Sequence, residues 1–522
     1  MDSKAFEPPQ FPERFNLADY LIHPNLAGGR ADKSAVEFED LRFSYREIDE
    51  GTSRAAGAFR ARGVEVENRV LLVLPDCPEF VVAWLGCLRA GAVACAVNPL
   101  LLEADFSYYL DYTRARLAVV DAEALERFLP AAQASRWLRA LLVRGAGGAA
   151  AATGEDFMAA LGAAPPHCES APTHRDDAAV WLFTSGTTGK PKGAVHRHAD
   201  FAYNIETYAK RVLQIREDDR TLSVPKLFFG YATGTNLMFP FAAGATTCLF
   251  AERSTAPVLF DQIERFRPTV LTNVPTMINA MLAEPAAARR DLSSLRICLS
   301  AGEALPPELY RRWQQAFGVE LLDGIGSAEM FHIYISNVPG DIVPGSLGRL
   351  VPGYDARIVD PEGREVGPGE VGTLWVKGGS ALQGYWHDHE KSVRTRLGEW
   401  VSTGDQFVCD QAGLFWYRGR RDELMKVSGV WVSPIEIEDA LLSHPQVAEC
   451  AVIGAQDDAG LTKPKAFVVL RPGAAPGAEL TAALQQHVKS LLLPTKYPRW
   501  IEYRDSLPKN DRGKVDRRAL NR

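Results

Sequence analysis

The sequence lacks long apolar segments, including one at its start. No uninterrupted apolar run approaches the roughly 18 residues that a membrane-spanning helix needs, so neither a spanning helix nor a membrane partner is expected. Residues 1–8 contain no apolar core of the kind found in a secretory signal, so we expect no signal peptide. These absences favour a cytoplasmic protein.

Paired cysteine motifs and an excess of positive charge are also missing. The eight cysteines form no Cys-x-x-Cys motif and most lie in apolar runs, which is typical of buried free thiols in a reducing compartment. The formal net charge of the 522 residues is −7, which argues against general nucleic-acid binding. With 46% hydrophobic and 24% charged residues, the composition is that of a globular protein with a large core.

The most distinctive stretch that is present is 184–193, a dense mixture of glycine, serine, threonine and lysine. It follows an apolar run, 178–183, that reads as a strand. Glycine lets the backbone approach a ligand closely, and exposed N–H, hydroxyl and ammonium groups suit a polyphosphate. An exposed basic turn is the ordinary alternative. Pro191 stands where a Walker A loop has its metal-binding hydroxyl, and no Gly-x-Gly-x-x-Gly fingerprint is present in the loop.

Strand-like and helix-like runs alternate on both sides of this loop, which predicts parallel sheets flanked by helices. We expect helices at 45–62, 78–90, 104–113 and 200–213, and strands at 70–74, 92–97, 117–120, 220–224, 246–250, 270–273, 297–300 and 321–324. Residues 1–40 are expected to wrap over the body, and the Ala/Gly-rich 140–166 to form a weak helix and surface loops.

The character of the chain changes after Pro344. Glycines and short alternating runs over 345–417 predict a small antiparallel, barrel-like β unit. Helices at 433–443 and 480–492 and strands at 447–453 and 465–470 then predict a compact α+β unit. The expected domains are a large α/β domain at 1–421 and a small C-terminal domain at 422–522.

Three isolated polar residues stand in unusual local patterns. Glu329 ends a glycine-rich turn, where its carboxylate suits Mg²⁺ beside phosphate oxygens, although a solvated cap is the ordinary alternative. Asp405 is either a turn residue or an acceptor for ribose hydroxyls. Lys514 alone reads as part of a frayed basic tail.

Together these segments resemble the adenylate-forming enzymes, which comprise acyl- and aryl-CoA ligases, luciferases and peptide-synthetase adenylation domains. The resemblance covers nearly the whole chain, with its motifs in the family's order. They are 184–193, 326–329, 402–405, 419–422, 426–429, 434–438 and 513–514.

The resemblance implies two half-reactions with ATP and CoA as co-substrates and Mg²⁺ as cofactor. A carboxylate attacks the α-phosphate of ATP, and the thiol of CoA then displaces AMP from the acyl-adenylate. Catalysis of the first step is mainly positioning and charge neutralisation. The ATP site would comprise Thr184, Ser185, Gly186, Thr187, Thr188, Gly189, Lys190, Lys192, Glu303, Ala304, Asp323, Gly324, Ile325, Ser327, Asp405 and Arg420.

Within that set the loop would hold the β/γ-phosphates, Glu303 and 323–325 the adenine, and Asp405 with Arg420 the ribose. Lys514 would bridge the substrate carboxylate and the α-phosphate, and Glu329 would hold Mg²⁺. The hinge and CoA channel would comprise Asp422, Lys426, Ser428 and Gly429.

Two residues depart from the family's Tyr-Gly-x-Thr-Glu pattern. Ile325 offers no phenol ring, and Ala328 lacks the hydroxyl that meets a phosphate or the acyl carboxylate. Ser327 is a candidate to compensate. We expect a lower rate or a weaker affinity for ATP.

The stretches 226–234 and 329–337 resemble the benzoate-CoA ligase branch, where they line the aryl pocket. Aromatic walls and small residues suit a short, flat, apolar ligand, although core packing explains the same residues. The pocket residues would be Phe229, Gly230, Tyr231, Gly326, His332 and Ile333. We predict a benzoate-type acid, with or without a small amino or hydroxyl group, and 2-aminobenzoate as a candidate.

The sequence also allows other interpretations of the protein's function. Residues 196–198, His-Arg-His, suggest a metal site, but the arginine between the two imidazoles argues against zinc there. The product acceptor could be a carrier protein, and 505–507 faintly resembles a phosphopantetheine site that Pro508 interrupts. A non-catalytic nucleotide-binding or aryl-acid-binding protein is a third possibility. The sequence leaves open a monomer or a homodimer.

Overall fold

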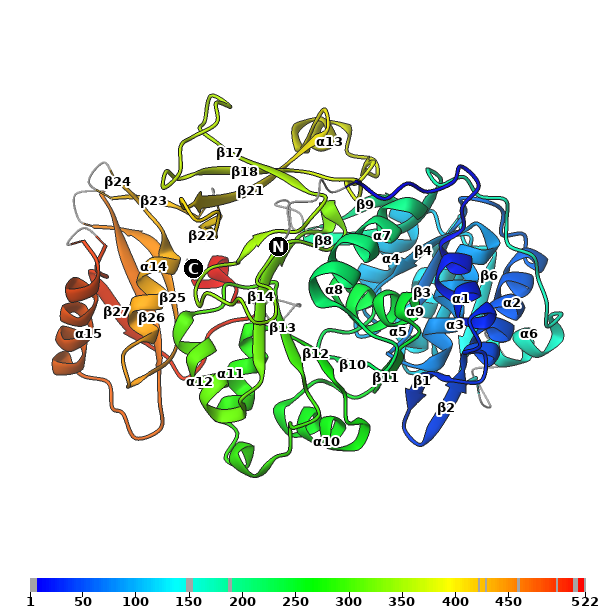
Figure 1. The fold of residues 1–522 in the computed structure, drawn as a ribbon, viewed down its shortest axis with the longest axis horizontal. Coiled ribbons are helices and arrows are strands. Elements are labelled where there is room, and N and C mark those ends of the chain that lie inside the picture. The colour runs from blue at the N-terminus through cyan, green and yellow to red at the C-terminus, as the bar shows by residue number, and fades with distance from the viewer. Residues whose placement is uncertain are drawn as a thin grey trace.

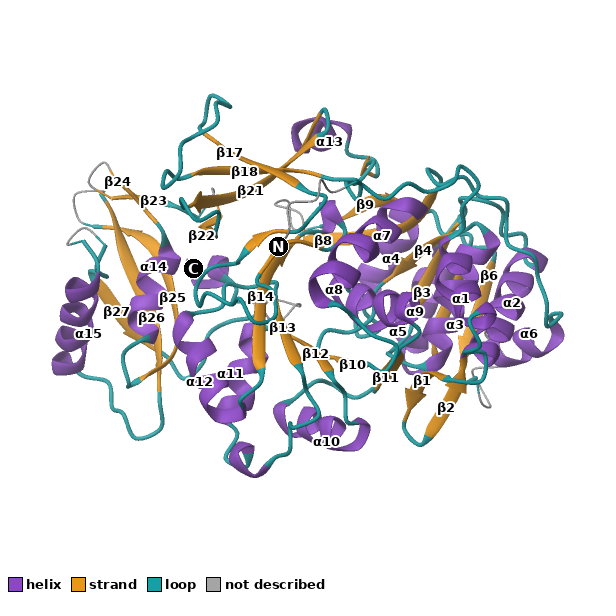
Figure 2. Cartoon of the chain, in the orientation of Figure 1, coloured by secondary structure: helices purple, strands orange, loops and turns teal. Residues whose placement is uncertain are grey.

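The computed structural model describes residues 7–146, 154–185, 190–420, 423–427, 430–457, 461–493, 496–509 and 515–520. Two large mixed sheets form the body, a five-stranded sheet lies above them, and a small α+β unit occupies the left end of the view (Figure 1; Figure 2). The predicted fold class, a large α/β domain followed by a small C-terminal α+β domain, is confirmed.

The first sheet has eight strands in the order β19-β9-β8-β4-β3-β5-β6-β7. The strands are β3 (Arg69–Val73), β4 (Val93–Ala96), β5 (Leu117–Asp121), β6 (Ala140–Arg144), β7 (Glu155–Asp156), β8 (Ala178–Ser185), β9 (Pro191–Arg197) and β19 (Gly384–Tyr385). The helices of this half are α1 (Leu17–Ala27), α2 (Tyr45–Ala61), α3 (Pro78–Ala90), α4 (Glu103–Thr113), α5 (Ala122–Ala134) and α6 (Phe157–Ala163).

Local signals set the helix ends here. Ser44 and Glu47 form a reciprocal capping box that starts α2. Proline occupies the first turn of α3, and Gly91 ends it in the left-handed conformation, with φ +78°. Both helices therefore lie where the sequence predicts them.

The second sheet has nine strands in the order β16-β15-β14-β13-β12-β10-β11-β1-β2. They are β1 (Ser34–Phe38), β2 (Leu41–Ser44), β10 (Arg220–Ser223), β11 (Thr246–Leu249), β12 (Val270–Asn273), β13 (Ile297–Ser300), β14 (Glu320–Gly326), β15 (Ile333–Ser336) and β16 (Arg349–Leu350). Its outer helices are α10 (Ala256–Phe266), α11 (Pro275–Ala283) and α12 (Pro307–Phe317), and a short 3-10 turn, η4, spans Ala287–Arg289.

Two composite helices lie between the sheets (Figure 1). One joins α7 (His198–Asn204) to the π-helical η2 (Ile205–Leu213), and the other joins α8 (Gly230–Thr233), η3 (Gly234–Met238) and α9 (Phe239–Ala243). The large core includes residues of both, such as Phe201 and Leu237. These helices bring side chains from the middle of the chain to the space between the two sheets.

The remaining strands form a five-stranded sheet and a C-terminal unit. The five-stranded sheet contains β17 (Asp355–Val359), β18 (Gly372–Lys377), β20 (Arg396–Leu397), β21 (Trp400–Cys409) and β22 (Phe415–Arg420), with α13 (His389–Thr395) beside it. The C-terminal unit contains β23 (Met425–Val427), β24 (Val430–Val432), β25 (Val447–Gln456), β26 (Thr462–Leu470), β27 (Trp500–Tyr503), α14 (Pro434–Leu442), α15 (Ala478–Leu491) and α16 (Arg517–Leu520).

Two expectations were wrong. Residues 140–166 include a sheet strand, β6, which pairs in parallel with β5 over its whole length. Residues 34–38 form β1 of the second sheet instead of an outer wrap, and pair in parallel with β11. In both places tertiary pairing overrides weak local propensity.

All eight cysteines lie in the described residues and none is in a disulfide. Among the helices of the described residues, none combines the length and the apolarity required to traverse a bilayer.

Candidate active site

The glycine-rich segment 184–193 contains the end of β8 and the start of β9. β8 and β9 pair antiparallel, with Thr184 opposite Lys192 and Ser185 opposite Pro191. The strand predicted before the loop is therefore confirmed as β8. Four predicted phosphate-binding residues lie outside the described residues, namely Gly186, Thr187, Thr188 and Gly189.

The two lysines of the hairpin have different surroundings. Lys192 Nζ lies 2.5 Å from Asp388 Oδ2, and its hydrogen bond lowers the pKa of the Asp388 carboxyl below the ordinary value. Lys190 is exposed, and its ammonium group lies 5.0 Å from the centre of the Tyr108 ring. A carboxylate thus holds Lys192, whereas Lys190 lies at the exposed end of the hairpin.

Glu329 lies on the connection between β14 and β15, in the short 3-10 turn η5 (Ala328–Met330). The Tyr385 hydroxyl donates a hydrogen bond of 2.5 Å to Glu329 Oε1. Burial, and the nearby Glu329 charge, raise the pKa of Tyr385, so the phenol stays protonated and able to donate. Tyr385 therefore restrains one oxygen of this carboxylate.

The same connection contains a strained residue. Phe331 has φ +66° and ψ −56°, and His332 N–H donates to Met330 O at 2.8 Å. These values define a classic-sense γ-turn, a rare and strained backbone conformation. Phe201 packs edge-on against the Phe331 ring at 4.5 Å. Such strain persists only where the surroundings over-determine the conformation, and it clusters at functional sites.

The predicted aryl-pocket residues converge on this turn from a second element. Phe229 and Gly230 begin α8, and His332 Nε2 lies 3.0 Å from Tyr231 O. Gly326 is required by close packing, because a Cβ there would lie 2.5 Å from the carbonyl carbon and oxygen of His332. Ile333 is buried at the start of β15.

Leu182 on β8 lies close to Gly230. A Cβ at position 230 would lie 3.1 Å from Leu182 Cδ1, so any side chain there would press against Leu182.

His332 is a neutral acceptor. It is 2% exposed, and burial lowers its pKa to about 3. A carbonyl oxygen can only accept, so the proton is on Nε2 and the lone pair on Nδ1. Within the described residues Nδ1 is buried and has no hydrogen-bond partner. A substrate N–H or O–H group would satisfy it.

The predicted adenine residues lie at the carboxyl ends of β13 and β14. The Glu303 carboxylate accepts from Thr276 N–H at 3.1 Å and from the Thr276 hydroxyl at 2.7 Å, which ties it to the start of α11. Burial raises the pKa of the Asp323 carboxyl well above its ordinary value. Ala304, Gly324 and Ile325 are neighbours of these two residues along the chain. Ser327 Oγ accepts from Met330 N–H at 3.3 Å and caps the η5 turn.

Asp405 and Arg420 face each other across β21 and β22. Arg420 Nη1 lies 3.4 Å from Asp405 Oδ1. Burial raises the pKa of Asp405 to about 6, and the Arg420 guanidinium opposes that shift. The sequence predicts this pair as the ribose contact, and the fold brings the two residues together.

The candidates in the C-terminal unit are largely outside the described residues. Lys514, Asp422, Ser428 and Gly429 are not described, and Lys426 is described only as the central residue of β23. A β-bridge between Lys509 and Val515 brackets the segment that contains Lys514. Arg517 anchors α16 to α14 through hydrogen bonds of 2.7 and 2.8 Å to Glu438.

Three further residues contact the candidate site without a sequence signal. Tyr385 lies 56 positions from its partner Glu329, and His196 lies 132 positions from Ala328, to which it bonds. Gly234 packs against the His332 ring. Gly234 ends the stretch 226–234 but is not among the predicted pocket residues, and His196 belongs to the His-Arg-His pattern that suggests a metal site.

The two histidines of the His-Arg-His pattern make separate hydrogen bonds within the fold. His198 Nδ1 accepts a hydrogen bond of 3.1 Å from Leu17 N–H on α1, and burial lowers its pKa to about 3. His196 instead contacts Asp200 and Ala328. The two imidazoles therefore serve different contacts.

A separate surface pocket of about 440 Å³ is lined by four arginines, Arg69, Arg114, Arg116 and Arg139. It lies where β3, β5 and β6 begin. Ligands of open α/β sheets collect at the carboxyl ends of strands, so this pocket is not the site outlined above.

The glycine-rich segment, the Glu329 turn and the Asp405–Arg420 pair occur in one chain, and the comparisons with known proteins show its class, an ATP-dependent adenylating enzyme. The chain belongs to the family of AMP-binding enzymes. The family's sequence model matches residues 25–386, and the model of the AMP-binding enzyme C-terminal domain matches 436–514.

Individual relatives match over almost the full length. The benzoate–CoA ligase of Thauera aromatica is 45% identical over 514 residues, which cover 98% of this chain and 96% of that protein. The structure of the anthranilate CoA ligase AuaEII with anthranoyl-AMP matches with a TM-score of 0.94 at 39% identity, covering 98% of this chain and 97% of that one. A benzoate CoA ligase from Burkholderia xenovorans LB400 matches with a TM-score of 0.90 at 41% identity, covering 97% of this chain and 100% of that one.

Proposed function

We propose that the protein is an aryl-CoA ligase that activates a benzoate-type acid, with benzoate and 2-aminobenzoate as the leading substrates. The observation that carries this proposal is the single connection between β14 and β15. Glu329 and His332 lie on it three residues apart, and we propose that Glu329 would face the phosphates and His332 the aryl ring. The acid and ATP would meet across this turn. The similarity to benzoate–CoA and anthranilate–CoA ligases supports the same assignment.

In the first half-reaction a carboxylate oxygen of the acid attacks the α-phosphorus, and the bond to pyrophosphate breaks. The hairpin loop at 184–193 would hold the β/γ-phosphates, and Lys514 would neutralise charge between the acid and the α-phosphate. Asp405 and Arg420 would hold the ribose, while Glu303, with residues 323–325, would frame the adenine. In the second half-reaction the CoA sulfur attacks the acyl carbon, and the bond to AMP breaks.

Mg²⁺ fits the donor set around Glu329. Among the described residues no group of three or more His, Cys, Asp or Glu side chains is placed to hold a metal ion. Mg²⁺ in phosphate-transfer sites is held by one or two carboxylates together with substrate oxygens and water. Glu329, oriented by Tyr385, would supply that carboxylate, and the ion would neutralise phosphate charge.

Selection among benzoates would fall to His332. Its Nδ1 is a buried acceptor without a protein partner in the described residues. A ring amino or hydroxyl group that reaches this nitrogen would satisfy it, whereas unsubstituted benzoate would leave it unpaired, at a cost of about 1–3 kcal/mol. We therefore expect kcat/KM for 2-aminobenzoate to exceed that for benzoate.

The proposal also includes the small C-terminal domain, residues 422–522, turning about Asp422 between the half-reactions, with Lys426, Ser428 and Gly429 beside the CoA channel. A cytoplasmic location suits the eight thiols, none of which is in a disulfide. Free CoA is the proposed acceptor, and a carrier protein the alternative.

The test is a panel of benzoate, 2-aminobenzoate, hydroxybenzoates and octanoate, scored by acyl-CoA formation, with mass-spectrometric trapping of acyl-AMP from the mixture. Rapid turnover of octanoate without turnover of benzoates would refute the substrate assignment. Comparison of CoA with a phosphopantetheinylated carrier protein decides the acceptor.

A further inference from the structure

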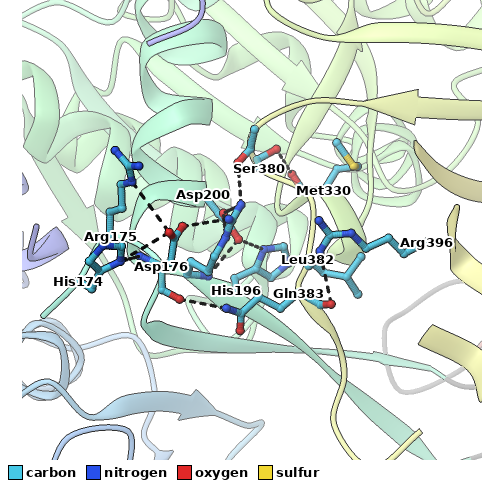
Figure 3. A network of polar contacts seen from close by, with 12 residues as sticks. His174, Arg175, Asp176, His196, Asp200, Met330, Ser380, Leu382, Gln383 and Arg396 are labelled. Atoms are coloured by element: carbon cyan, nitrogen blue, oxygen red, sulfur yellow. Dashed lines mark hydrogen bonds and ion pairs between the residues drawn. The ribbon is translucent and has the colours of Figure 1, made fainter. Parts of the chain in front are cut away.

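Three successive carbonyl groups of the Glu329 turn each receive a hydrogen bond from outside the turn. His196 Nε2 lies 2.6 Å from Ala328 O, Leu382 N–H donates to Glu329 O at 2.8 Å, and Ser380 Oγ donates to Met330 O at 2.8 Å. Figure 3 shows His196, Ser380 and Leu382 around Met330. The first of these donors is a side chain of β9, the strand that follows the glycine-rich loop.

His196 is unusually constrained. The residue is fully buried, and its two ring nitrogens both face acceptors, Ala328 O on one side and Asp200 Oδ2, at 3.2 Å, on the other. The carbonyl can only accept, so Nε2 donates. Asp200 is fully buried as well, and its other contacts are from Arg197.

The network continues outward as alternating charges. Arg197 Nε donates to Asp200 Oδ1 at 2.8 Å, and Arg197 Nη1 donates to Asp176 Oδ1 at 3.0 Å. Asp176 and Asp200 are visible in Figure 3 on the side of His196 away from Met330. A buried ring held on one side by a paired carboxylate has little freedom to shift, so its donor is fixed in space.

We propose that His196 is a positioning residue for the first half-reaction: its Nε2–H holds the Ala328 carbonyl and thereby sets the direction of the Glu329 carboxylate. This inference rests on the proposed function. The γ-turn at Phe331, two residues beyond Glu329, is strained and needs external restraint. Ala328 itself has no side-chain hydroxyl to supply one.

An ordinary core histidine would also be buried and hydrogen-bonded. His196 differs from such a histidine in its hydrogen-bond partner, which is the Glu329 turn. His198, two residues along, bonds instead to α1. If His196 only stabilised the fold, its loss would affect both half-reactions equally. If it positions Glu329, the loss falls on the step that uses Mg·ATP.

The experiment compares His196→Leu, which removes the donor, with His196→Gln, whose amide N–H can reach the position of Nε2. For His196→Leu we expect kcat/KM for Mg·ATP in aryl-AMP formation to fall by about 10- to 100-fold, the range that a misplacement of about 1 Å produces. CoA transfer from supplied aryl-AMP should stay within about twofold, since aryl-AMP needs no Mg·ATP positioning. His196→Gln should restore adenylation to within about fivefold of the unmodified protein, because it retains the hydrogen bond.

Calorimetric titration supplies a readout without turnover. His196→Leu should bind ATP more weakly than the unmodified protein when Mg²⁺ is present, and equally well in EDTA. His198→Gln is the matched control, since it removes a buried imidazole from the same segment. We expect this control to lower the thermal midpoint without changing the Mg²⁺ dependence.

Equal loss of both half-reactions in His196→Leu, no recovery in His196→Gln, or an unchanged Mg²⁺ dependence would each overturn the proposal. The proposed function is tested separately by the unmodified protein. If that protein forms no aryl-AMP, the function assignment fails. If it does, the variants alone decide the role of His196.

Discussion

Substitution of Gly234 by alanine should damage the aryl pocket more than the ATP site. Gly234 begins the π-helical segment η3 and faces the His332 ring. A Cβ on Gly234 would lie 2.4 Å from His332 Cδ2 and 2.6 Å from Nε2. The imidazole would have to move by about 1 Å to regain ordinary contact distances, and its hydrogen bond to Tyr231 O would stretch or break.

The energetic consequence follows from three effects. Overpacking a well-filled site costs about 1–3 kcal/mol, and loss of the His332 hydrogen bond costs about 1 kcal/mol. Alanine is better than glycine in a helix by about 1 kcal/mol, which offsets part of this cost. We expect a net destabilisation of about 1–3 kcal/mol. KM for the aryl acid should rise by about tenfold or more through the displaced ring, with KM for ATP nearly unchanged.

The assay combines thermal unfolding with separate KM values for the acid and for ATP. The matched control is Gly162→Ala in α6, where an added Cβ would meet nothing within 4 Å. That control should keep both KM values and gain up to about 1 kcal/mol. An unchanged acid KM in Gly234→Ala, or an equal rise in both KM values, would refute this account of the pocket.

Three further outcomes are expected. Lys514→Ala should lower adenylation by orders of magnitude and leave CoA transfer from supplied aryl-AMP intact; equal loss of both steps would contradict its assigned role. Because burial raises the pKa of Asp405 to about 6 from 3.8, its carboxyl gains a proton as pH falls through 6. KM for ATP should therefore rise below pH 6, and Asp405→Asn should remove that dependence. The free energy of unfolding depends on pH in a different way. The raised pKa of Asp405 stabilises the folded state most at low pH, and this contribution is lost as pH rises through 6. Ala328→Thr should raise kcat or lower KM for ATP by restoring the family's hydroxyl, and slower adenylation in this variant would show that Ala328 is adapted to its surroundings.

The parts of the fold with strong local signals were predictable from the sequence. The helix at 78–90 and the strands at 270–273 and 297–300 coincide with α3, β12 and β13, because proline, glycine and uninterrupted apolar runs mark their limits. Strand β6 was missed because alanine and glycine around it suggest a surface segment, whereas its pairing with β5 is a tertiary effect. The π-helical turns, such as η3, also have no sequence signature of their own.

The candidate site also contains features that the sequence predicts and features that it does not. Glu329, Asp405 and Arg420 were predictable because each lies in a short motif, and the register of β21 and β22 places the last two opposite each other. The contacts that orient these side chains could not be predicted from the sequence. Tyr385 reaches Glu329 only because β19 pairs with β9, which brings a distant segment beside the turn. No spacing along the chain encodes that meeting.

The turn between β14 and β15 also limits how independently its two ends can vary. Glu329 and His332 are separated by Met330 and by the strained residue Phe331, whose ring packs against Phe201. A close-packed interior transmits displacements between neighbouring groups. The hydrogen bonds to the carbonyl groups of Ala328, Glu329 and Met330 oppose such a displacement, which is why KM for ATP is expected to stay nearly unchanged in Gly234→Ala. A change made to the ring-binding side, as in Gly234→Ala, therefore tests the geometry of the carboxylate as well. The extent to which KM for ATP stays constant in that variant measures how well the donors from His196, Leu382 and Ser380 isolate the phosphate side from the aryl side.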